Sequence, residues 1–468
     1  MRSSDTTTSS PMAPDLKGKR LHFVGIGGSG MSGLARLCAA RGACVSGSDR
    51  GDSPAAAKLR EEGFVVAAEQ TQDTLPAETD LVVVSAAIPI DHPERAAARQ
   101  RGVEVMKYAA LLGQLMIGRC GVAVAGTHGK STTTSILCHA LMGSGLDPSF
   151  ILGAHCEQIG GGSRTGQSDV LIAEACEYDR SFHHFYPTHG LILNVEADHL
   201  DLYASIDEIV ESFAHFAALL PKEGSLLIQH ESPHRMAIAA GLKANVETLG
   251  FAPQADWQIE LDGGHVTLKA RGQPVAEWDN PMPGDHFAYN AAAAAVTAHR
   301  LGAPWNAVAT HIAGFTGLDR RMQWIGEKGG VTLVDDYGHH PTEVDTTLRA
   351  LRTHHEPGRL ICVFQPHQHS RTRHLMEQFL VSFSAADIVI VPEIYFVRDT
   401  EQERHAVTAG DLVDRLRQRG VKAMHLHPFS AIAEQLELMV KPGDLVVTMG
   451  AGDVWQVGRD WFAARGGA

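Results

Sequence analysis

The apolar residues of this chain gather in short runs that end in glycine-rich or polar loops, and a helical pattern follows most of those loops. Residues 21–24, 81–84 and 360–364 are runs of this kind, typical of buried parallel strands. Because strand and helix patterns alternate along most of the chain, the sequence predicts an α/β fold built from doubly wound sheets. Weakly alternating runs near Leu226, Trp257 and Val266 add an antiparallel edge to a parallel sheet.

The strand, loop and helix pattern is clearest at residues 122–134. An apolar run there leads into Gly126, Thr127, His128, Gly129, Lys130, Ser131 and Thr132. Unpaired N–H groups at a helix start face an anion, and glycines let the main chain approach phosphate oxygens. Lys130 would neutralise the outer phosphates, and the Ser131 hydroxyl would ligate the accompanying Mg²⁺. The pattern predicts an ATP site. Val124 stands where the strict motif has glycine, so a strand-to-helix turn with an incidental Lys-Ser pair is the alternative.

A second glycine loop follows residues 21–24 and contains Gly25, Gly27, Gly28 and Gly30. A helical pattern over residues 31–40 comes next, and a further strand ends near Asp49, as in dinucleotide-binding proteins. Phosphates would lie at the helix start, and Asp49 would accept a hydrogen bond from a ribose hydroxyl. NAD is the usual ligand of this pattern, which by itself does not identify the nucleotide. The turn at Ser85 is either a ligand contact at a strand end or an ordinary tight turn.

Two polar positions in the centre of the chain indicate a metal site. Glu174 ends an apolar run, and His199 closes a polar cluster that follows another. A buried carboxylate is costly unless a cation or hydrogen bonds compensate it. Mg²⁺ between Glu174 and Ser131 would do so, and His199 could hold a second ion. Taken singly, Glu174 and His199 are more often capping or solvent-facing residues.

Polar loops at the ends of C-terminal strands carry arginines and histidines, which suit phosphate or carboxylate ligands. A solvated loop is the alternative for each residue alone. Upstream, His286 and Asn290 are four residues apart on one predicted helix face, where the Asn would bond an adenine edge or cap the helix. The candidates in the loops are Arg321, Asp336, Tyr337, His339, Arg371 and Arg373.

Length and charge narrow the function further. The 468 residues suffice for about three domains, and the net charge of -14 without a basic cluster argues against nucleic acid or an anionic membrane as partner. No apolar run approaches the ~20 residues of a membrane helix, and the Ser/Thr-rich start lacks signal-peptide features, so we expect a cytoplasmic protein. The expected division is a disordered tail at 1–16 and domains at 17–117, 118–316 and 317–468.

Five motifs in this order resemble the Mur ligases of peptidoglycan synthesis, and within that family the members that join L-alanine to UDP-N-acetylmuramate. They are residues 25–33, 126–133, 194–199, 335–343 and 364–367. The resemblance implies a Rossmann-like domain for the uridine nucleotide, a central mixed-sheet phosphate-loop domain for ATP, and a Rossmann-like C-terminal domain that closes over the site with the amino acid. Phe287, Cys176 and Tyr178 depart from the usual family pattern.

The resemblance also implies a mechanism and assigns roles. The muramate carboxylate attacks the γ-phosphate of ATP, and the amine of L-alanine displaces phosphate from the resulting acyl phosphate. Gly25, Gly27, Gly28, Gly30, Asp49 and Ser85 would hold the sugar nucleotide rather than NAD. Lys130, Glu174, His199 and Arg371 would be catalytic, with magnesium at Ser131, Glu174 and His199. His286 and Asn290 would contact adenine, Arg321 and Asp336 the ATP phosphates and ribose, and Tyr337, His339, Arg371 and Arg373 the carboxylate and amino acid.

Three alternatives remain open at this point. The chain could be the related recycling ligase that attaches a whole tripeptide to the same sugar nucleotide. It could be a nucleotide-dependent oxidoreductase that uses the first glycine loop, although Lys130, Glu174 and His199 would then have no role. It could also be a module that binds nucleotide without chemistry. We expect a monomer or a homodimer.

Overall fold

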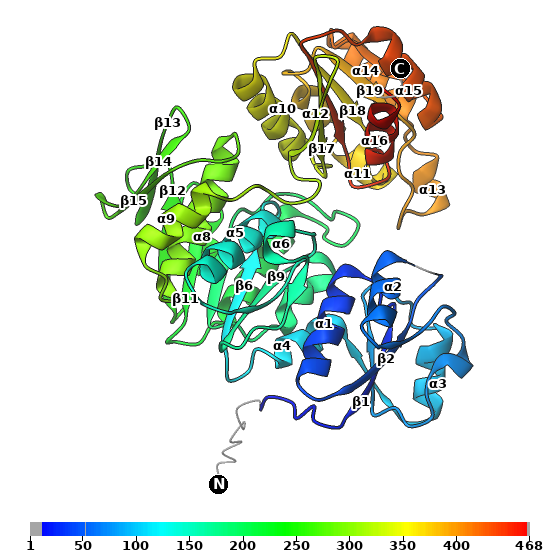
Figure 1. Cartoon of the computed structure of the whole chain (residues 1–468), viewed down its shortest axis with the longest axis vertical. Coiled ribbons are helices and arrows are strands. Elements are labelled where there is room, and N and C mark those ends of the chain that lie inside the picture. Colours follow the sequence, from blue (N-terminus) through cyan, green and yellow to red (C-terminus); the bar gives the residue numbers. More distant parts are fainter. Residues whose placement is uncertain (1–11, 52, 466–468) are drawn as a thin grey trace.

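The computed structural model describes residues 12–51 and 53–465, which form three sheets and therefore three domains. Figure 1 shows the N-terminal domain at the bottom in blue, the middle domain in cyan and green, and the C-terminal domain at the top in yellow to red. The predicted α/β class with three domains is confirmed. No helix in the described ranges is long and apolar enough to cross a membrane. The expected disorder of the tail concerns mainly residues 1–11, which lie outside those ranges.

The N-terminal domain is a five-stranded parallel sheet in the order β3-β2-β1-β4-β5, the Rossmann-like arrangement expected. Leu16 is buried against this domain's core, so the packed chain begins one residue before the predicted boundary. Its strands are β1 (Arg20–Val24), β2 (Cys44–Ser48), β3 (Val65–Ala67), β4 (Leu81–Val84) and β5 (Glu104–Lys107). Its helices are α1 (Ser29–Ala40), α2 (Pro54–Glu61), α3 (Pro93–Gln100) and α4 (Tyr108–Gln114), with a short 3-10 turn η1 (Gln72–Thr74).

The middle domain holds a ten-stranded mixed sheet, in which β6 lies between β10 and β9. The predicted antiparallel edge is confirmed at Trp257 and Val266, because β13, β14 and β15 form a meander at one end. The prediction was wrong for the run at Leu226, which lies in β11 and pairs in parallel with β10 and β12. The strands are β6 (Cys120–Ala125), β7 (Ser149–Ile151), β8 (Ser163–Arg164), β9 (Val170–Ala175), β10 (His189–Ile192), β11 (Ser225–Gln229), β12 (Asn245–Gly250), β13 (Trp257–Asp262), β14 (His265–Ala270) and β15 (Gln273–Asp279). The helices are α5 (Lys130–Gly143), α6 (Ile206–Ala218), α7 (Arg235–Ala239), α8 (Asp285–Arg300) and α9 (Trp305–Ala313), with 3-10 turns η2 (Glu157–Ile159) and η3 (Tyr178–His184).

The C-terminal domain has a six-stranded sheet in the order β16-β17-β21-β18-β19-β20, parallel except for β16. Its strands are β16 (Gln323–Lys328), β17 (Val331–Asp336), β18 (Arg359–Phe364), β19 (Ile388–Val391), β20 (Ala423–His425) and β21 (Asp444–Met449). Its helices are α10 (Pro341–His355), α11 (His369–His374), α12 (Met376–Ser382), α13 (Glu401–Arg404), α14 (Ala409–Gln418), α15 (Phe429–Met439) and α16 (Trp455–Ala464).

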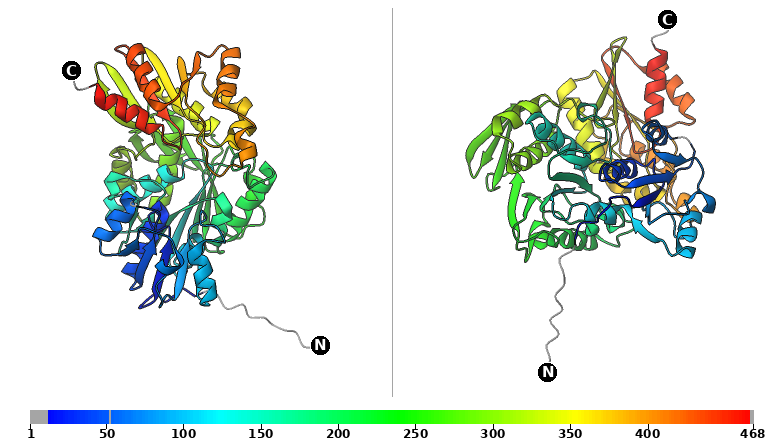
Figure 2. Two further views of the ribbon diagram at one scale, coloured as in Figure 1. Left: turned by 90° about the vertical axis from the view of Figure 1, so that its right-hand side faces the viewer. Right: turned by 60° about the horizontal axis from the view of Figure 1, so that its bottom comes forward.

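The hydrophobic cores are divided unequally among the domains. One cluster is continuous across the first two, joining Leu34 and Leu112 to Ala173 and Phe213. Helix α1 lies so close to the middle domain that a Cβ on Gly33 would come within 2.7 Å of the Ser163 Cβ. The C-terminal domain has two clusters of its own, one on each side of its sheet. The two views in Figure 2 show that domain beyond the middle one, with the ends of its strands facing the middle domain.

Candidate active site

The loop between β6 and α5 has the geometry of an anion site. Gly126 and Gly129 adopt φ values of 145° and 82°, conformations that L side chains rarely take. A Cβ on Gly126 would lie 3.0 Å from the Leu193 Cβ, so the loop can run against β10 only with glycine there. Helix α5 begins at Lys130, and its first N–H groups open toward the loop. The strand, turn and helix expected at these positions are all present.

Lys130 is anchored by a carboxylate that the sequence did not single out. Its Nζ donates to Glu177 Oε2 at 2.9 Å and Oε1 at 3.2 Å, and to the carbonyl oxygen of Thr127 at 3.1 Å. Burial opposes the charge of Lys130, but the Glu177 carboxylate, together with Cys176 and Glu174, outweighs burial and raises the pKa of Lys130. The ammonium is therefore held charged beside the helix start, where a transferring phosphoryl group would need it.

Ser131 and Glu174 are brought together as predicted for a magnesium site. The Ser131 Oγ donates to Glu174 Oε2 at 3.0 Å, and the Gly153 N–H donates to Oε1 at 2.7 Å. Burial raises the pKa of Glu174, which means that its negative charge is short of compensation. A hydroxyl and a carboxylate are oxygen ligands of the kind that Mg²⁺ takes, and a cation would supply the missing compensation. These residues therefore fit the ion.

His199 lies beside Glu177, the carboxylate that anchors Lys130. Its Nε2 is 3.8 Å from Glu177 Oε1, and its buried Nδ1 has no hydrogen-bond partner among the described residues. The backbone at His199 has φ 52°, so the ring is held in an uncommon left-handed conformation. The carboxylates of Glu177 and Asp198 lie 3.8 and 3.9 Å from Nε2, the other ring nitrogen. The predicted role of His199 as a metal ligand stays a prediction.

A cavity between the middle and C-terminal domains begins at the phosphate loop. His128, Gly129, Thr132, His286 and Asn290 line it from the middle domain, and Arg321, Asp336, Glu343 and Thr347 line it from the C-terminal domain. Asn290 touches the loop, since a Cβ on Gly129 would be 2.5 Å from its Oδ1. Burial lowers the pKa of His286 to about 4, so its ring is neutral and its Nδ1 is unpartnered. The residues predicted for adenine, ribose and phosphate thus share one cavity.

Two of the cavity residues are already bound by neighbours. Asp336 accepts hydrogen bonds from the N–H groups of Met322 at 2.7 Å and Gly338 at 2.6 Å, and burial raises its pKa to about 6. Arg321 Nη1 is 3.4 Å from Glu343 Oε1. Phe287, the departure from the family pattern, is buried and stacks on Phe315 with ring centroids 6.2 Å apart. Phe287 therefore supplies an apolar wall rather than a polar contact.

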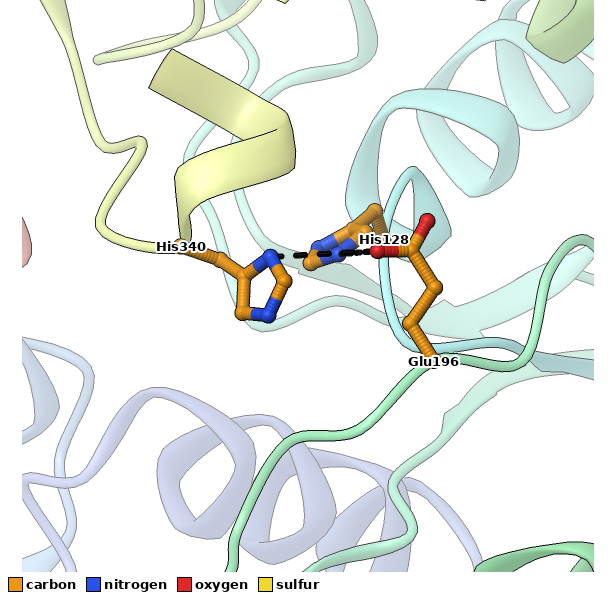
Figure 3. Close-up of side chains that lie close together, drawn as sticks. All are labelled: His128, Glu196 and His340. Carbon is orange, nitrogen blue, oxygen red and sulfur yellow. Dashed lines mark ion pairs between the residues drawn. The ribbon is translucent and has the colours of Figure 1, made fainter. Parts of the chain in front are cut away.

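A network of histidines and carboxylates joins the two domains at the same cavity. His128 lies 3.3 Å from Glu343 and 3.7 Å from Glu196, and His340 Nδ1 is 3.9 Å from Glu196. Figure 3 shows His340, at the start of α10, and His128 pointing at the Glu196 carboxylate from opposite domains. Burial disfavours a charge on His128, but Glu343 and Glu196 raise its pKa to about 10. The contact between the domains thus keeps the imidazolium of His128, a residue of the phosphate loop, positively charged.

Arg371 forms a second contact between the domains. Its Nε donates to Asp198 Oδ1 at 2.9 Å, and its Nη1 is 3.1 Å from His367 Nδ1. Burial opposes ionisation of Asp198, but the charge of Arg371 holds the pKa of that carboxyl well below its usual range. In this arrangement the predicted catalytic arginine is paired with a side chain of the middle domain.

The other residues predicted for the amino acid are only partly gathered. The guanidinium groups of Arg320 and Arg321 each lie over the Tyr337 ring, 5.0 Å from its centroid. His339 faces His367 at 5.7 Å, and burial lowers its pKa to about 4. Arg373 is exposed and contacts His374, so the structure does not bring it to this group. Alternate residues of the short helix α11 point in different directions, which explains the separation of Arg373 from Arg371.

The N-terminal glycine loop makes different side-chain contacts from those of the phosphate loop. Asp49 Oδ2 accepts a hydrogen bond from the Gly27 N–H at 2.6 Å, so this carboxylate supports the loop itself. A Cβ on Gly27 would be 2.1 Å from that oxygen, and one on Gly30 would be 2.8 Å from the Tyr108 hydroxyl. Gly25 has φ 78° and faces Ser85 across the loop. Gly28 is exposed at the helix start, so the N–H groups there are open to a ligand.

Three family models match the chain in the order of its domains. They are described as the Mur ligase family catalytic domain over residues 20–119, the Mur ligase middle domain over residues 124–298, and the Mur ligase glutamate ligase domain over residues 320–452. The chain belongs to the Mur ligase family. The three matches coincide with the three sheets, so each domain of this Mur ligase corresponds to one family model.

Individual members of the family resemble this chain over nearly its whole length. A UDP-N-acetylmuramate–L-alanine ligase of Caldanaerobacter subterraneus is 38% identical over 453 residues, 95% of this chain and 98% of the relative. One from Desulfitobacterium hafniense is 38% identical over 94% of this chain and 98% of its own length. Among solved structures, the UDP-N-acetylmuramate-alanine ligase of Thermotoga maritima superimposes with TM-score 0.80 at 24% identity, covering 95% and 98%. A murein peptide ligase from Psychrobacter arcticus gives TM-score 0.70 at 24% identity, covering 96% and 99%.

Sequence reasoning missed several carboxylates of this Mur ligase. Glu177 follows Glu174 by three residues, and Glu196 and Asp198 lie in the cluster that ends at His199. Glu343 is the third residue of α10 and forms a capping box with His340, the N-cap residue. Their positions in polar loops at strand ends were visible in the sequence. Their partners were not, because Lys130, Arg371 and His128 reach them from distant segments or from another domain.

Proposed function

We propose that this Mur ligase joins L-alanine to UDP-N-acetylmuramate, with ATP converted to ADP and phosphate. The observation that carries the proposal is the phosphate loop with Lys130, Ser131 and Glu174, opening into a cavity between two domains. The curated relatives that share 37–38% identity over most of the chain bear this activity in their names. Reaction of a carboxylate with ATP needs charge neutralisation and exclusion of water. The charged Lys130 supports the first, and the side chains that bridge the two domains support the second.

The proposed steps use the chain's own residues as follows. The carboxylate of the sugar nucleotide attacks the γ-phosphorus, and ADP leaves as the new acyl phosphate bond forms. The unprotonated amine of L-alanine then attacks the acyl carbon, phosphate departs and the amine loses a proton. Lys130, held charged by Glu177, would neutralise the transferring group at the start of α5. Mg²⁺, held by Ser131 and Glu174, would screen the phosphate oxygens.

Closure of the C-terminal domain gives the water exclusion. Arg371 with Asp198, and His128 with Glu343, bridge the middle and C-terminal domains around the cavity. An acyl phosphate formed in open solvent would hydrolyse and waste ATP. We infer that Arg371 alternates between Asp198 and the substrate carboxylate, because a buried guanidinium needs one acidic partner at all times.

One alternative within the family has support of its own. The fold also superimposes on murein peptide ligases, one of which is the UDP-N-acetylmuramate:L-alanyl-gamma-D-glutamyl-meso-diaminopimelate ligase of Neisseria meningitides. The open question is therefore the size of the amine substrate. The experiment is phosphate release from ATP with UDP-N-acetylmuramate, in which L-alanine, L-serine, glycine and the tripeptide are added in turn.

The outcomes of that experiment distinguish the proposed reaction from its alternatives. We expect release that requires both the sugar nucleotide and L-alanine. Release with the tripeptide alone would assign the chain to the recycling reaction. No release with any amine, although ATP binds, would leave a nucleotide-binding module. A cytoplasmic location and a monomeric or homodimeric state belong to the same proposal, and light scattering on the purified chain tests the latter.

A further inference from the structure

We propose that the C-terminal domain carries a separate site for a divalent transition metal, of the class of Zn²⁺, formed by Glu393, His425 and His427. One ligand atom from each of these three side chains lies within 4.8 Å of the other two. The group lies beyond the carboxyl ends of β19 and β20, at one edge of the C-terminal sheet. It shares no residue with the ATP cavity, and the proposal does not depend on the reaction assigned above.

The strand register explains why the three side chains meet. In the parallel pair β19 and β20, Val391 lies opposite His425. The pairing continues past the strands, because the Leu426 N–H donates to the Val391 carbonyl oxygen at 3.2 Å. Residues two apart on extended chains point to the same face, so His425 and His427 share a face, and Glu393 shares it from the neighbouring strand. A backbone pairing, rather than chance contact of long side chains, therefore sets this arrangement.

The distances match those of a zinc ligand set. Zn²⁺ binds imidazole nitrogen and carboxylate oxygen at about 2.0–2.2 Å in tetrahedral geometry, which puts neighbouring ligand atoms about 3.3 Å apart. Here Glu393 Oε1 lies 3.4 Å from His425 Nε2 and 3.6 Å from His427 Nε2. Charge-assisted hydrogen bonds between such groups are shorter, about 2.7–2.9 Å. The spacing therefore suits an ion between the groups better than direct ion pairs.

His425 provides an independent indication. Its Nε2 is buried and makes no hydrogen bond within the described residues, although it points at Glu393. A buried nitrogen without a partner costs free energy, and a metal ion at the centre of the three groups would remove that cost. The Nε2 atoms of His425 and His427 both lie within 3.6 Å of the same carboxylate oxygen, Glu393 Oε1.

The ligand set also selects the class of ion. Two imidazoles with one carboxylate favour Zn²⁺, Co²⁺ or Ni²⁺, whereas Mg²⁺ prefers oxygen ligands. The side chains of Glu393 and His427 are 61% and 60% exposed, so an ion can enter from solvent, and water can fill the fourth position. A bound ion would tie the segment after β19 to the segment after β20 and so stabilise the fold by mass action.

The test titrates Co²⁺ into the full chain at saturating Mg²⁺, which occupies the oxygen site at Ser131 and Glu174. Bound Co²⁺ is followed by visible absorption and by equilibrium dialysis, and Zn²⁺ is then added to displace it. We expect wild type to bind one equivalent more than His427→Ala, whose affinity at this site should fall by at least ~10-fold. Zn²⁺ should raise the melting temperature of wild type but not that of the variant.

Matched variants keep the result interpretable. The chain has 26 histidines, so His405→Ala serves as a control that removes an exposed histidine elsewhere in the same domain. Glu393→Gln keeps the size of the side chain and removes its charge, and we expect it to behave like His427→Ala. Equal stoichiometry in wild type and His427→Ala would overturn the proposal, and so would an equal loss in His405→Ala.

Discussion

The N-terminal glycine loop and the phosphate loop have the same backbone plan and different surroundings. Each follows a buried parallel strand and opens a helix, α1 after β1 and α5 after β6. At the first loop, the Asp49 carboxylate accepts a hydrogen bond from the Gly27 N–H and so stabilises the loop. At the second, Lys130 lies inside the loop, and Glu174 and Glu177 reach it from the end of β9.

The difference shows what a strand, glycine loop and helix provide alone. Helix N–H groups and glycines suffice to hold a diphosphate. Transfer of a phosphoryl group needs charges that approach from several directions, and at the phosphate loop these come from neighbouring strands and from the C-terminal domain. The first loop is thus suited to holding a nucleotide, and the second to chemistry on one.

The largest effect should follow the loss of Lys130. Lys130→Ala should lower ATP turnover by on the order of 10²-fold or more, because it removes the charge nearest the transferring group. Phosphate release under saturating substrates measures it. Lys58→Ala, which removes an exposed lysine from α2, is the matched control and should leave turnover unchanged. If Lys130→Ala retained its turnover, the phosphate loop would not differ from the first loop in supporting chemistry.

Glu174→Gln should have the next largest effect. The amide keeps the shape of Glu174 but removes its charge, so the Mg²⁺ concentration that gives half-maximal turnover should rise by at least ~10-fold. A magnesium titration of the rate measures this shift. Glu211→Gln, on the exposed face of α6, controls for loss of a carboxylate in the same domain. An unchanged magnesium requirement would contradict the metal role of Glu174.

Gly27→Ala tests the holding role of the first loop. The new Cβ would lie 2.1 Å from the Asp49 Oδ2, so the loop must shift. We expect the KM for the sugar nucleotide to rise about 10-fold, with a smaller change in kcat and in the KM for ATP. Gly314→Ala, at an exposed position with φ −87°, is the control. A fall in kcat alone would mean that this loop takes part in the chemistry.

The smallest effect concerns pH and the domain contact. Glu343 and Glu196 outweigh burial and raise the pKa of His128 from 6.5 to about 10, so its contribution to closure is complete below pH 6.5 and disappears as pH rises through 10. Burial raises the pKa of Glu196, but His128 of the same domain and Thr342 and His340 of the C-terminal domain together lower it from 4.5 to about 2. The contribution of the contacts from Thr342 and His340 to closure is therefore complete above pH 4.5 and is lost as pH falls through 2.

Closure should therefore be strongest between about pH 4.5 and 6.5 and should weaken gradually on the alkaline side. Fluorescence energy transfer between dyes on the middle and C-terminal domains measures it. His128→Gln should flatten the alkaline arm of the profile. An unaltered profile in that variant would show that other contacts govern closure.

The sequence predicted the fold well because its signals are local. Apolar runs, glycine turns and helix patterns are set by neighbouring residues, and so Ser131, Gly129 and the antiparallel edge were predictable. The network of histidines, arginines and carboxylates between the domains was not predictable, because its contacts join residues that are far apart in the sequence. Nothing near Arg371 in the sequence shows that Asp198 is its partner. The sequence also predicted the same role for Arg371 and Arg373, and only the structure of α11 shows that their side chains point in different directions.

The continuous core of the first two domains limits how this chain can be dissected. Leu112 and Phe213 belong to one apolar cluster, so a cut between the N-terminal and middle domains would expose both halves to aggregation. The C-terminal domain keeps its own clusters on both sides of its sheet. Because no core cluster of buried residues in the described ranges spans the middle and C-terminal domains, a boundary near residue 317 is a better place to divide the chain for expression of its parts than one near residue 117.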